Sequence, residues 1–216
     1  MNRFLLLLLV LGLGVSLFAQ VQLPEHHFAT GSGNWSFRGD RLFQNDASAR
    51  LAKVNILVPQ SGSMIYEFNL RYESGIADDH GGVGIHIFAN DVLHSASWGN
   101  GTSYLLWINY DDAPVTPGIQ RGFSAQVYRS YSHTRMDLLE SYDLNHFAHL
   151  LTPGNFADPI PIRIWADGNT GEVRFYDPTD PNLERYFYFF LPERNLRGNW
   201  VSLRTNGLSI SFGSGL

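Results

Sequence analysis

One expected strand carries polar side chains at a spacing that could support acid–base chemistry. Glu67, Asn69 and Arg71 alternate with apolar residues, so their side chains point to one face of the strand. A retaining glycosidase needs two carboxylates roughly 5.5 Å apart, one as acid and one as nucleophile. Only Glu67 is a carboxylate here. We therefore expect this protein not to be an enzyme, and a glycoside hydrolase is the least favoured interpretation.

Further polar and aromatic side chains lie opposite the apolar faces of other expected strands. Proteins bind sugars with an aromatic ring that stacks on a pyranose and with amide, carboxylate and Arg groups that address its hydroxyls. If the strands are neighbours, these side chains form one wall, with Trp98 on a glycine-rich loop at its rim. The expected ligand-binding residues are Glu67, Asn69, Arg71, His86, Trp98, Trp107, Asn109, Gln126 and Tyr128.

Trp107 and Tyr128 are the expected stacking residues of this wall. Alternation places Ile108 and Val127 in the core and therefore turns both rings away from it. A residue on an open face contributes little to the core, so Trp107→Ala is expected to fold. The alternative is that Trp107 packs beneath a loop.

Metal-binding and nucleophile motifs are weak in this sequence. Adjacent aspartates at Asp78–Asp79 and Asp111–Asp112 supply the oxygen ligands that Ca²⁺ prefers, although solvated turns explain them equally. The eight histidines do not form a set with zinc-ligand spacing. A nucleophile elbow, a phosphate loop and a zinc-protease motif are all absent from the sequence. We expect no cofactor, with calcium near these aspartates as the one open alternative.

Period-two alternation dominates the chain and predicts strands throughout. Turn sequences such as Asp167–Gly171 and Asn206–Gly207 separate the alternating runs, and no run of a dozen residues has a helical period. One all-β domain of two packed sheets is therefore expected. The expected strands span residues 35–44, 49–57, 63–73, 82–90, 104–110, 121–129, 135–139, 161–166, 172–176, 185–191, 200–205 and 208–212.

The first nineteen residues are expected to direct export. Arg3 is followed by an apolar run that is too short for a comfortable membrane span and ends near the small residue Ala19. We expect a signal peptide over residues 1–19, cleavage after Ala19, one mature domain over 20–216 and no later membrane span. The chain has no cysteine, which suits a bacterial periplasmic or extracellular protein that folds without disulfides.

Composition excludes several classes of protein. Hydrophobic residues make up 44% of the chain and charged residues 16%, which excludes a disordered chain and a charge-rich coiled coil. The formal net charge is −5. Because nucleic-acid binders carry a basic surface, we expect no nucleic-acid partner.

Several segments together resemble one family of β-sandwich proteins. The segments are GNWSFRGDRLFQNDASA near the start, GGVGIHIFA and TSYLLWINYD in the centre, and IRIWADGNTGEVRFYDP and GNWVSLRTNGLSISF near the end. Their order resembles the concanavalin A-like lectin/glucanase superfamily, including its laminin-G-like relatives. The resemblance implies an antiparallel two-sheet jelly roll.

The same resemblance bears on catalysis. Family-16 glycoside hydrolases of this superfamily carry their acids on one strand as Glu-x-Asp-x-Glu. The matching positions here are Glu67, Asn69 and Arg71, so two of the three carboxylates are missing. The resemblance therefore implies a non-catalytic binding module whose partner is a glycan.

An aromatic strand favours a second function. The segment 185–191 reads RYFYFFL and is apolar on both faces. A fully buried central strand would have this pattern, and an edge strand would instead expose an apolar patch to a protein partner. The second arrangement suits a structural protein of the bacterial envelope, or of an extracytoplasmic filament such as the spirochaete periplasmic flagellum. We expect a carbohydrate-binding module, with this structural role as the alternative.

Overall fold

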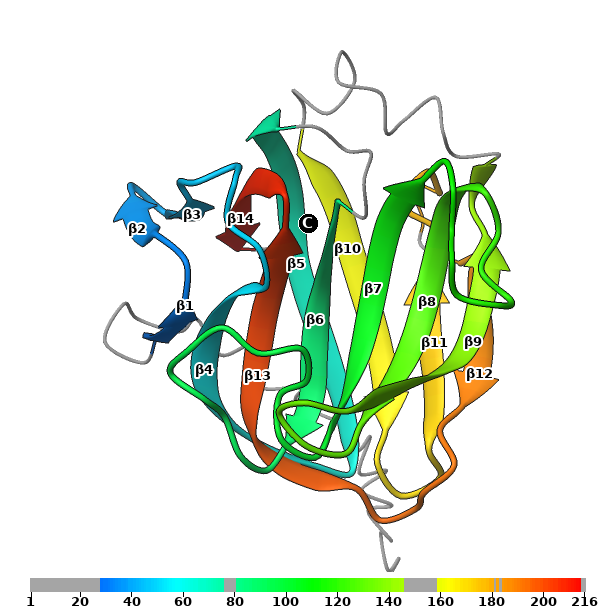
Figure 1. Cartoon of the computed structure of the whole chain (residues 1–216). Helices are drawn as coiled ribbons and strands as arrows, with labels where there is room; N and C mark the ends of the chain where they lie inside the picture. Colours follow the sequence, from blue (N-terminus) through cyan, green and yellow to red (C-terminus); the bar gives the residue numbers. More distant parts are fainter. Residues whose placement is uncertain (1–27, 76–80, 146–158, 181, 183, 215–216) are drawn as a thin grey trace, which may run out of the picture.

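Two antiparallel sheets of seven strands each pack face to face in the computed structural model (Figure 1). The structure describes residues 28–75, 81–145, 159–180, 182 and 184–214. None of these residues belongs to an α-helix, and so none forms a helix that is long and apolar enough to cross a membrane. The expected signal peptide lies outside the described residues.

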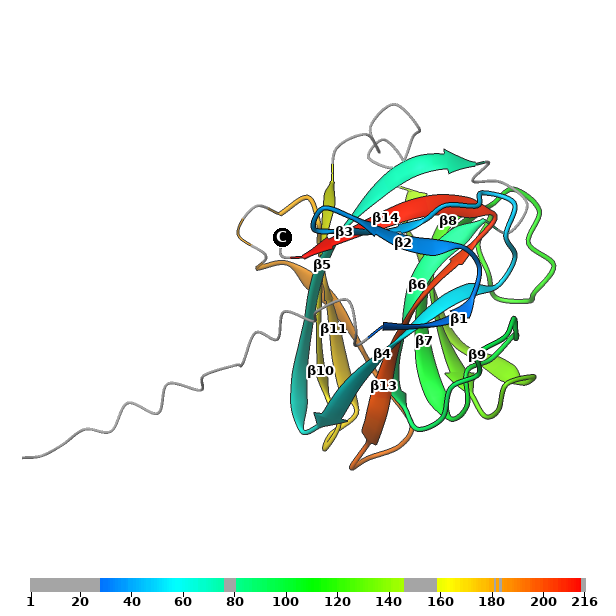
Figure 2. The ribbon, with the colours of Figure 1, turned by 90° about the vertical axis from the view of Figure 1, so that its left-hand side faces the viewer.

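We call the two layers the front sheet and the back sheet, as Figure 1 shows them. The front sheet contains, in spatial order, β1 (Phe28–Ser32), β4 (Ala52–Ser61), β13 (Arg197–Asn206), β6 (Gly82–Ala89), β7 (Ser103–Asp111), β8 (Gly122–Ser130) and β9 (Met136–Asp143). The back sheet contains β12 (Tyr186–Phe190), β11 (Glu172–Tyr176), β10 (Ile160–Asp167), β5 (Ser63–Gly75), β14 (Leu208–Ser214), β3 (Arg41–Gln44) and β2 (Trp35–Arg38). Figure 2 shows these two layers from the side.

The expected all-β class and two-sheet sandwich are confirmed. Each segment expected to be extended contains a strand of the structure, and the run 35–44 is a hairpin of β2 and β3 that turns at Gly39. Gly39 has a φ of 62°, a conformation that glycine adopts at little cost. β1 was not expected, because FATGS has no apolar alternation.

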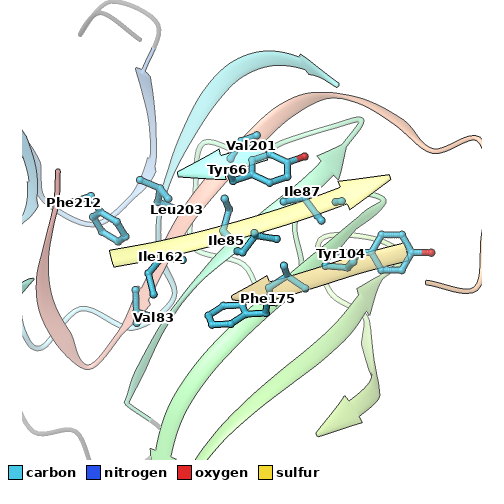
Figure 3. Packing of buried hydrophobic residues seen from close by; sticks show 14 of the residues in the cluster. Tyr66, Val83, Ile85, Ile87, Tyr104, Ile162, Phe175, Val201, Leu203 and Phe212 are labelled. Carbon is cyan, nitrogen blue, oxygen red and sulfur yellow. The ribbon is translucent and has the colours of Figure 1, made fainter. Parts of the chain in front are cut away.

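Alternating apolar side chains from both sheets form one core. Val83, Ile85 and Ile87 of β6 face Ile162 and Ile164 of β10 across the interlayer space, as Figure 3 shows for most of them. Each of these side chains is at most 8% exposed. This packing confirms the apolar face predicted for the segment that forms β6, because side chains at alternate positions of a strand point to the same face.

Aromatic contacts close the two open sides of the sandwich. Phe28 of β1 meets Phe37 of β2 edge to face, with ring centres 5.1 Å apart. On the other side, Tyr142 of β9 packs against Phe187 of β12 at 5.0 Å. Each contact joins the border strands of the two sheets, so the apolar interior is covered where the layers end.

The aromatic strand β12 lies at the border of the back sheet, beside β11. Phe187 and Phe189 point inward and join the core, whereas Tyr186, Tyr188 and Phe190 point outward and are exposed. Its two apolar faces therefore have different roles: one completes the core and the other is an exposed aromatic row.

Candidate functional site

The expected ligand-binding residues fall on opposite outer faces of the sandwich. Glu67, Asn69 and Arg71 lie on β5 of the back sheet, and the others lie on the front sheet or its covering loop. The prediction of one wall is wrong, because β5 pairs with β10 and β14 rather than with β6. Alternation determines which face of a strand is polar, but it does not determine the sheet that the strand joins.

Side-chain pairs within β5 and between strands occupy the back-sheet group. Arg163 donates from Nε to a Glu67 carboxylate oxygen at 2.6 Å, and Arg71 Nε donates to Glu73 at 2.8 Å. Asn69 accepts a hydrogen bond from Arg41 at 2.5 Å. Each of these three predicted residues is thus engaged by a neighbouring side chain on the back sheet, and Glu67 is held by an Arg rather than paired with a second carboxylate.

The front-sheet group does come together, along β7 and β8. Asn109 Oδ1 accepts hydrogen bonds from Ser124 Oγ at 2.9 Å and from Gln126 Nε2 at 2.6 Å. The Tyr128 hydroxyl donates to Gln126 Oε1 at 2.6 Å, and Trp107 lies directly opposite Gln126 in the β7–β8 ladder. A connected row of amide and hydroxyl groups therefore runs beside the Trp107 ring.

Trp107 is buried on this outer face, with only 8% of its surface exposed. Its ring lies over two glycines of β6: a Cβ atom added to Gly82 would lie 2.5 Å from the ring, and one added to Gly84 would lie 2.8 Å from it. Any larger residue at these positions would displace the ring. The expectation that Trp107 is an open stacking residue is corrected, and the alternative that it is packed and covered fits the structure.

Two buried cations that the predicted site did not include lie on the same face. Lys53 of β4 donates to the carbonyl oxygens of Ser97 at 3.0 Å and Gly99 at 2.7 Å, and also to the Ser97 hydroxyl. Arg204 of β13 donates to the carbonyl of Trp98. The sequence indicated only the outer face for Arg204, which alternates with the core residues Val201 and Leu203. No local pattern indicated that either cation is buried.

Burial dominates the electrostatics of this cluster. It lowers the pKa of Lys53 to about 7, with a further contribution from the nearby positive charge of Arg204. Burial also lowers the pKa of Arg204 to about 10 and that of His86 well below its usual value. Among the ion pairs of the described residues, none involves Lys53 or Arg204, so backbone carbonyls rather than carboxylates compensate these charges.

Hydrogen bonding identifies a ring nitrogen of His86 that carries a proton. The Ser103 hydroxyl donates its single hydrogen to the Asn100 carbonyl at 3.0 Å. The Nδ1 atom of His86 lies 2.9 Å from the same hydroxyl oxygen and must therefore be the donor. Because burial lowers the pKa of His86 well below its usual value, the ring is a neutral imidazole with its proton on Nδ1, and it acts as a structural partner of the β6–β7 connection.

That connection, residues 90–102, crosses the outer face of the front sheet (Figure 1). Asn100 donates to Ser202 Oγ on β13 at 2.7 Å. The backbone N–H of Gly101 donates to His133 Nδ1 at 3.0 Å. Together with the bonds from Lys53, these contacts tie the loop to β4 and β13 and to the turn between β8 and β9.

The tethered loop presents one exposed indole. Trp98 is 49% exposed, and its ring lies 5.3 Å from the Arg204 guanidinium. The same guanidinium lies 5.5 Å from the Trp107 ring, so Arg204 stands between an exposed and a buried tryptophan. One side of Trp98 is supported by a cation–π contact, and the exposed part of the ring is available to a ligand.

The aspartates of one expected calcium position make local hydrogen bonds. Asp111 accepts the backbone N–H of Ala113 at 2.9 Å, and Asp112 accepts the hydroxyl of Tyr110 at 2.8 Å. Within the described ranges, no three His, Cys, Asp or Glu side chains gather as a metal site would require. Asp78 and Asp79 lie outside the described residues.

Comparison with known proteins supports the fold at low sequence identity. No protein-family model and no curated protein sequence matches this chain. The crystal structure of the Emp47p carbohydrate recognition domain superposes with a TM-score of 0.50 and 14% identity, covering 91% of this chain and 92% of that chain. The metal-free Emp46p carbohydrate recognition domain gives 0.50 and 11%, covering 88% and 89%. The predicted concanavalin A-like jelly roll is thereby confirmed as the fold.

Proposed function

We propose that this protein is a non-catalytic carbohydrate-binding module and that its sugar contact is on the front sheet, at Trp98. The observation that carries this proposal is an exposed indole on a loop that buried cations hold in place. The likeness to two carbohydrate recognition domains supports the same class of function.

Trp98 suits a pyranose because an indole offers a flat apolar surface to the C–H groups of the sugar ring. The loop is fixed before a ligand arrives, so binding does not have to order it. Tyr128 is half-buried on the same outer face, and its hydroxyl is oriented by Gln126. We assign to it a polar contact with the ligand.

We propose a non-catalytic function because of the ion pair that Glu67 forms. Its carboxylate pairs with Arg163 on the back sheet, and Trp98 lies on the opposite layer. Acid catalysis of glycoside hydrolysis needs a second carboxylate close to the first, and the neighbouring positions on the strand are Asn69 and Arg71.

Trp98→Ala is expected to weaken binding of a soluble monovalent oligosaccharide by about 5- to 150-fold, which corresponds to roughly 1–3 kcal/mol for one stacking aromatic. Titration calorimetry against a panel of neutral and acidic oligosaccharides measures this change. Tyr188→Ala removes an even more exposed aromatic from the back sheet and should leave the affinity unchanged. Equal affinity of the Trp98 variant and the parent protein would exclude Trp98 from the site.

We propose in addition that the protein is exported to a bacterial periplasm or exterior and that residues 1–19 are removed. The support is the apolar run from Phe4 to Val15 and the short tail after it, which ends in the small residue Ala19. N-terminal sequencing of protein purified from an expressing bacterium should begin at Gln20. A first residue of Met1 would contradict the proposal.

A structural role in the envelope is the second candidate. The observation that favours it is the exposed aromatic row of Tyr186, Tyr188 and Phe190, because apolar side chains gathered on a surface indicate a protein partner. Co-purification of an envelope or filament protein that is lost on Tyr188→Ala and kept on Trp98→Ala would favour this role over the first.

A further inference from the structure

β12 is a border strand with one unpaired side. In the described part of the chain it pairs with β11 alone, and it stands at the right-hand margin of the back sheet in Figure 1. A border strand presents a row of N–H and C=O groups that can pair with another strand.

The register shows which backbone groups point outward. Asp177 donates its N–H to the Arg185 carbonyl at 2.9 Å, and Leu191 donates to the Gly171 carbonyl at 2.8 Å. Hydrogen-bonded pairs alternate along an antiparallel ladder. Phe187 therefore bonds to β11, as does every second residue between these two contacts. The backbone groups of Tyr186, Tyr188 and Phe190 point to the open side.

The same three residues carry the exposed side chains. Tyr186, Tyr188 and Phe190 are 43%, 59% and 55% exposed on the outer face. The segment 186–191 contains no charged residue, proline or glycine. Charged residues and proline protect many natural border strands from pairing, and β12 has neither.

We propose that β12 binds β12 of a second copy of this chain, antiparallel and about a two-fold axis at Tyr188. The strand is self-complementary in this arrangement: Tyr188 faces Tyr188 of the copy, and Tyr186 faces Phe190. All of these residues direct N–H and C=O groups outward, so each facing pair exchanges two hydrogen bonds. The back sheets join into one sheet of fourteen strands, seven from each copy.

A second copy fits this surface better than a foreign strand for two reasons. Aromatic side chains meet aromatic side chains across the seam, an arrangement favoured between neighbouring strands, and like charges do not face each other at these three positions. A two-fold contact also closes on itself, so it gives a dimer rather than a fibre. The proposal is independent of sugar binding, because Trp98 lies on the other sheet.

Sedimentation equilibrium of the mature chain, from low micromolar to several hundred micromolar, tests this dimer. Tyr188→Pro removes the outward N–H without removing a bond to β11, and proline is tolerated on border strands. It is expected to raise the dimer dissociation constant by about 100-fold or more. The matched control Tyr188→Thr keeps the N–H and should raise it by less than about 10-fold. Circular dichroism and thermal melting confirm that each variant is folded.

A second variant covers the case in which Tyr188→Pro does not fold. Tyr188→Lys places two like charges opposite each other across the axis and should leave the protein monomeric. In hydrogen exchange of the parent protein, the Tyr186, Tyr188 and Phe190 amides should gain protection as concentration rises. A parent protein that stays monomeric, or a dimer that survives Tyr188→Lys, overturns the proposal. Association only with a different protein overturns it too and identifies a foreign strand as the occupant.

Discussion

Trp107→Ala is expected to lower the free energy of unfolding by about 3–5 kcal/mol, the range for removing a buried large aromatic side chain. The ring is 8% exposed, lies over Gly82 and Gly84, and has the Arg204 guanidinium 5.5 Å from its centre. Alanine at this position would leave a cavity over Gly82 and Gly84 of β6 and would remove the ring that packs near the Arg204 guanidinium. Urea denaturation followed by circular dichroism measures the change.

Trp98→Ala is the matched control for this prediction. Trp98 is 49% exposed, and its loss removes one cation–π contact, so the free energy of unfolding should fall by less than about 1 kcal/mol. Both tryptophan rings lie near Arg204, so the two variants are comparable. Trp107→Ala should lower stability, whereas Trp98→Ala should lower ligand affinity. A loss of less than about 1 kcal/mol for Trp107→Ala would show that the ring is not buried and would restore the open stacking surface.

The stability of the protein is expected to rise with pH between about 7 and 9.5, because of Lys53. Burial lowers the pKa of Lys53 to about 7 in the folded protein, whereas an unfolded lysine has its ordinary pKa near 10.4. Above pH 7 the folded state releases this proton and the unfolded state keeps it. The free energy of unfolding should therefore increase by up to about 1.4 kcal/mol per pH unit, and urea unfolding at several pH values measures the slope.

Lys53→Met removes the titrating group while keeping most of the side-chain volume. The free energy of unfolding of this variant should therefore not change with pH across the same range. The window isolates Lys53 from its neighbours. Because the pKa of His86 is lowered from its ordinary value of 6.5, His86 changes the free energy of unfolding only below about pH 6.5. The pKa of Arg204 is lowered to about 10, so Arg204 contributes only at the upper end of the pH range and above it. Parallel slopes for the variant and the parent protein would show that Lys53 is not the cause.

Alternation in the sequence determined which residues of each strand enter the core. Val127 of β8 is buried as predicted, and Leu70 of β5 and Ile85 of β6 follow the same alternation, because the pleat of a strand sends successive side chains to opposite faces wherever the strand lies. The same rule correctly placed Trp107 and Arg71 on outer faces. The two-sheet sandwich follows from this pattern, since many half-apolar strands must cover one another.

The tertiary structure alone decided which strands are neighbours. β5 and β6 are adjacent in sequence, yet they lie in different layers, with β5 between β10 and β14 and β6 between β13 and β7. Such pairing joins residues far apart in the chain, and alternation carries no information about it. For this reason Arg71 and Trp107, both on polar faces, lie on opposite sides of the molecule.

The burial of the front face was also decided only in three dimensions. Lys53 and Arg204 alternate with core residues in the manner of exposed side chains, and they are buried because residues 90–102 fold back across their strands. The free energy that holds a charged group in such a place comes from carbonyls more than forty residues away in sequence. A local pattern contains no record of those distant partners, so the sequence by itself predicted an open surface where the folded chain has a covered one.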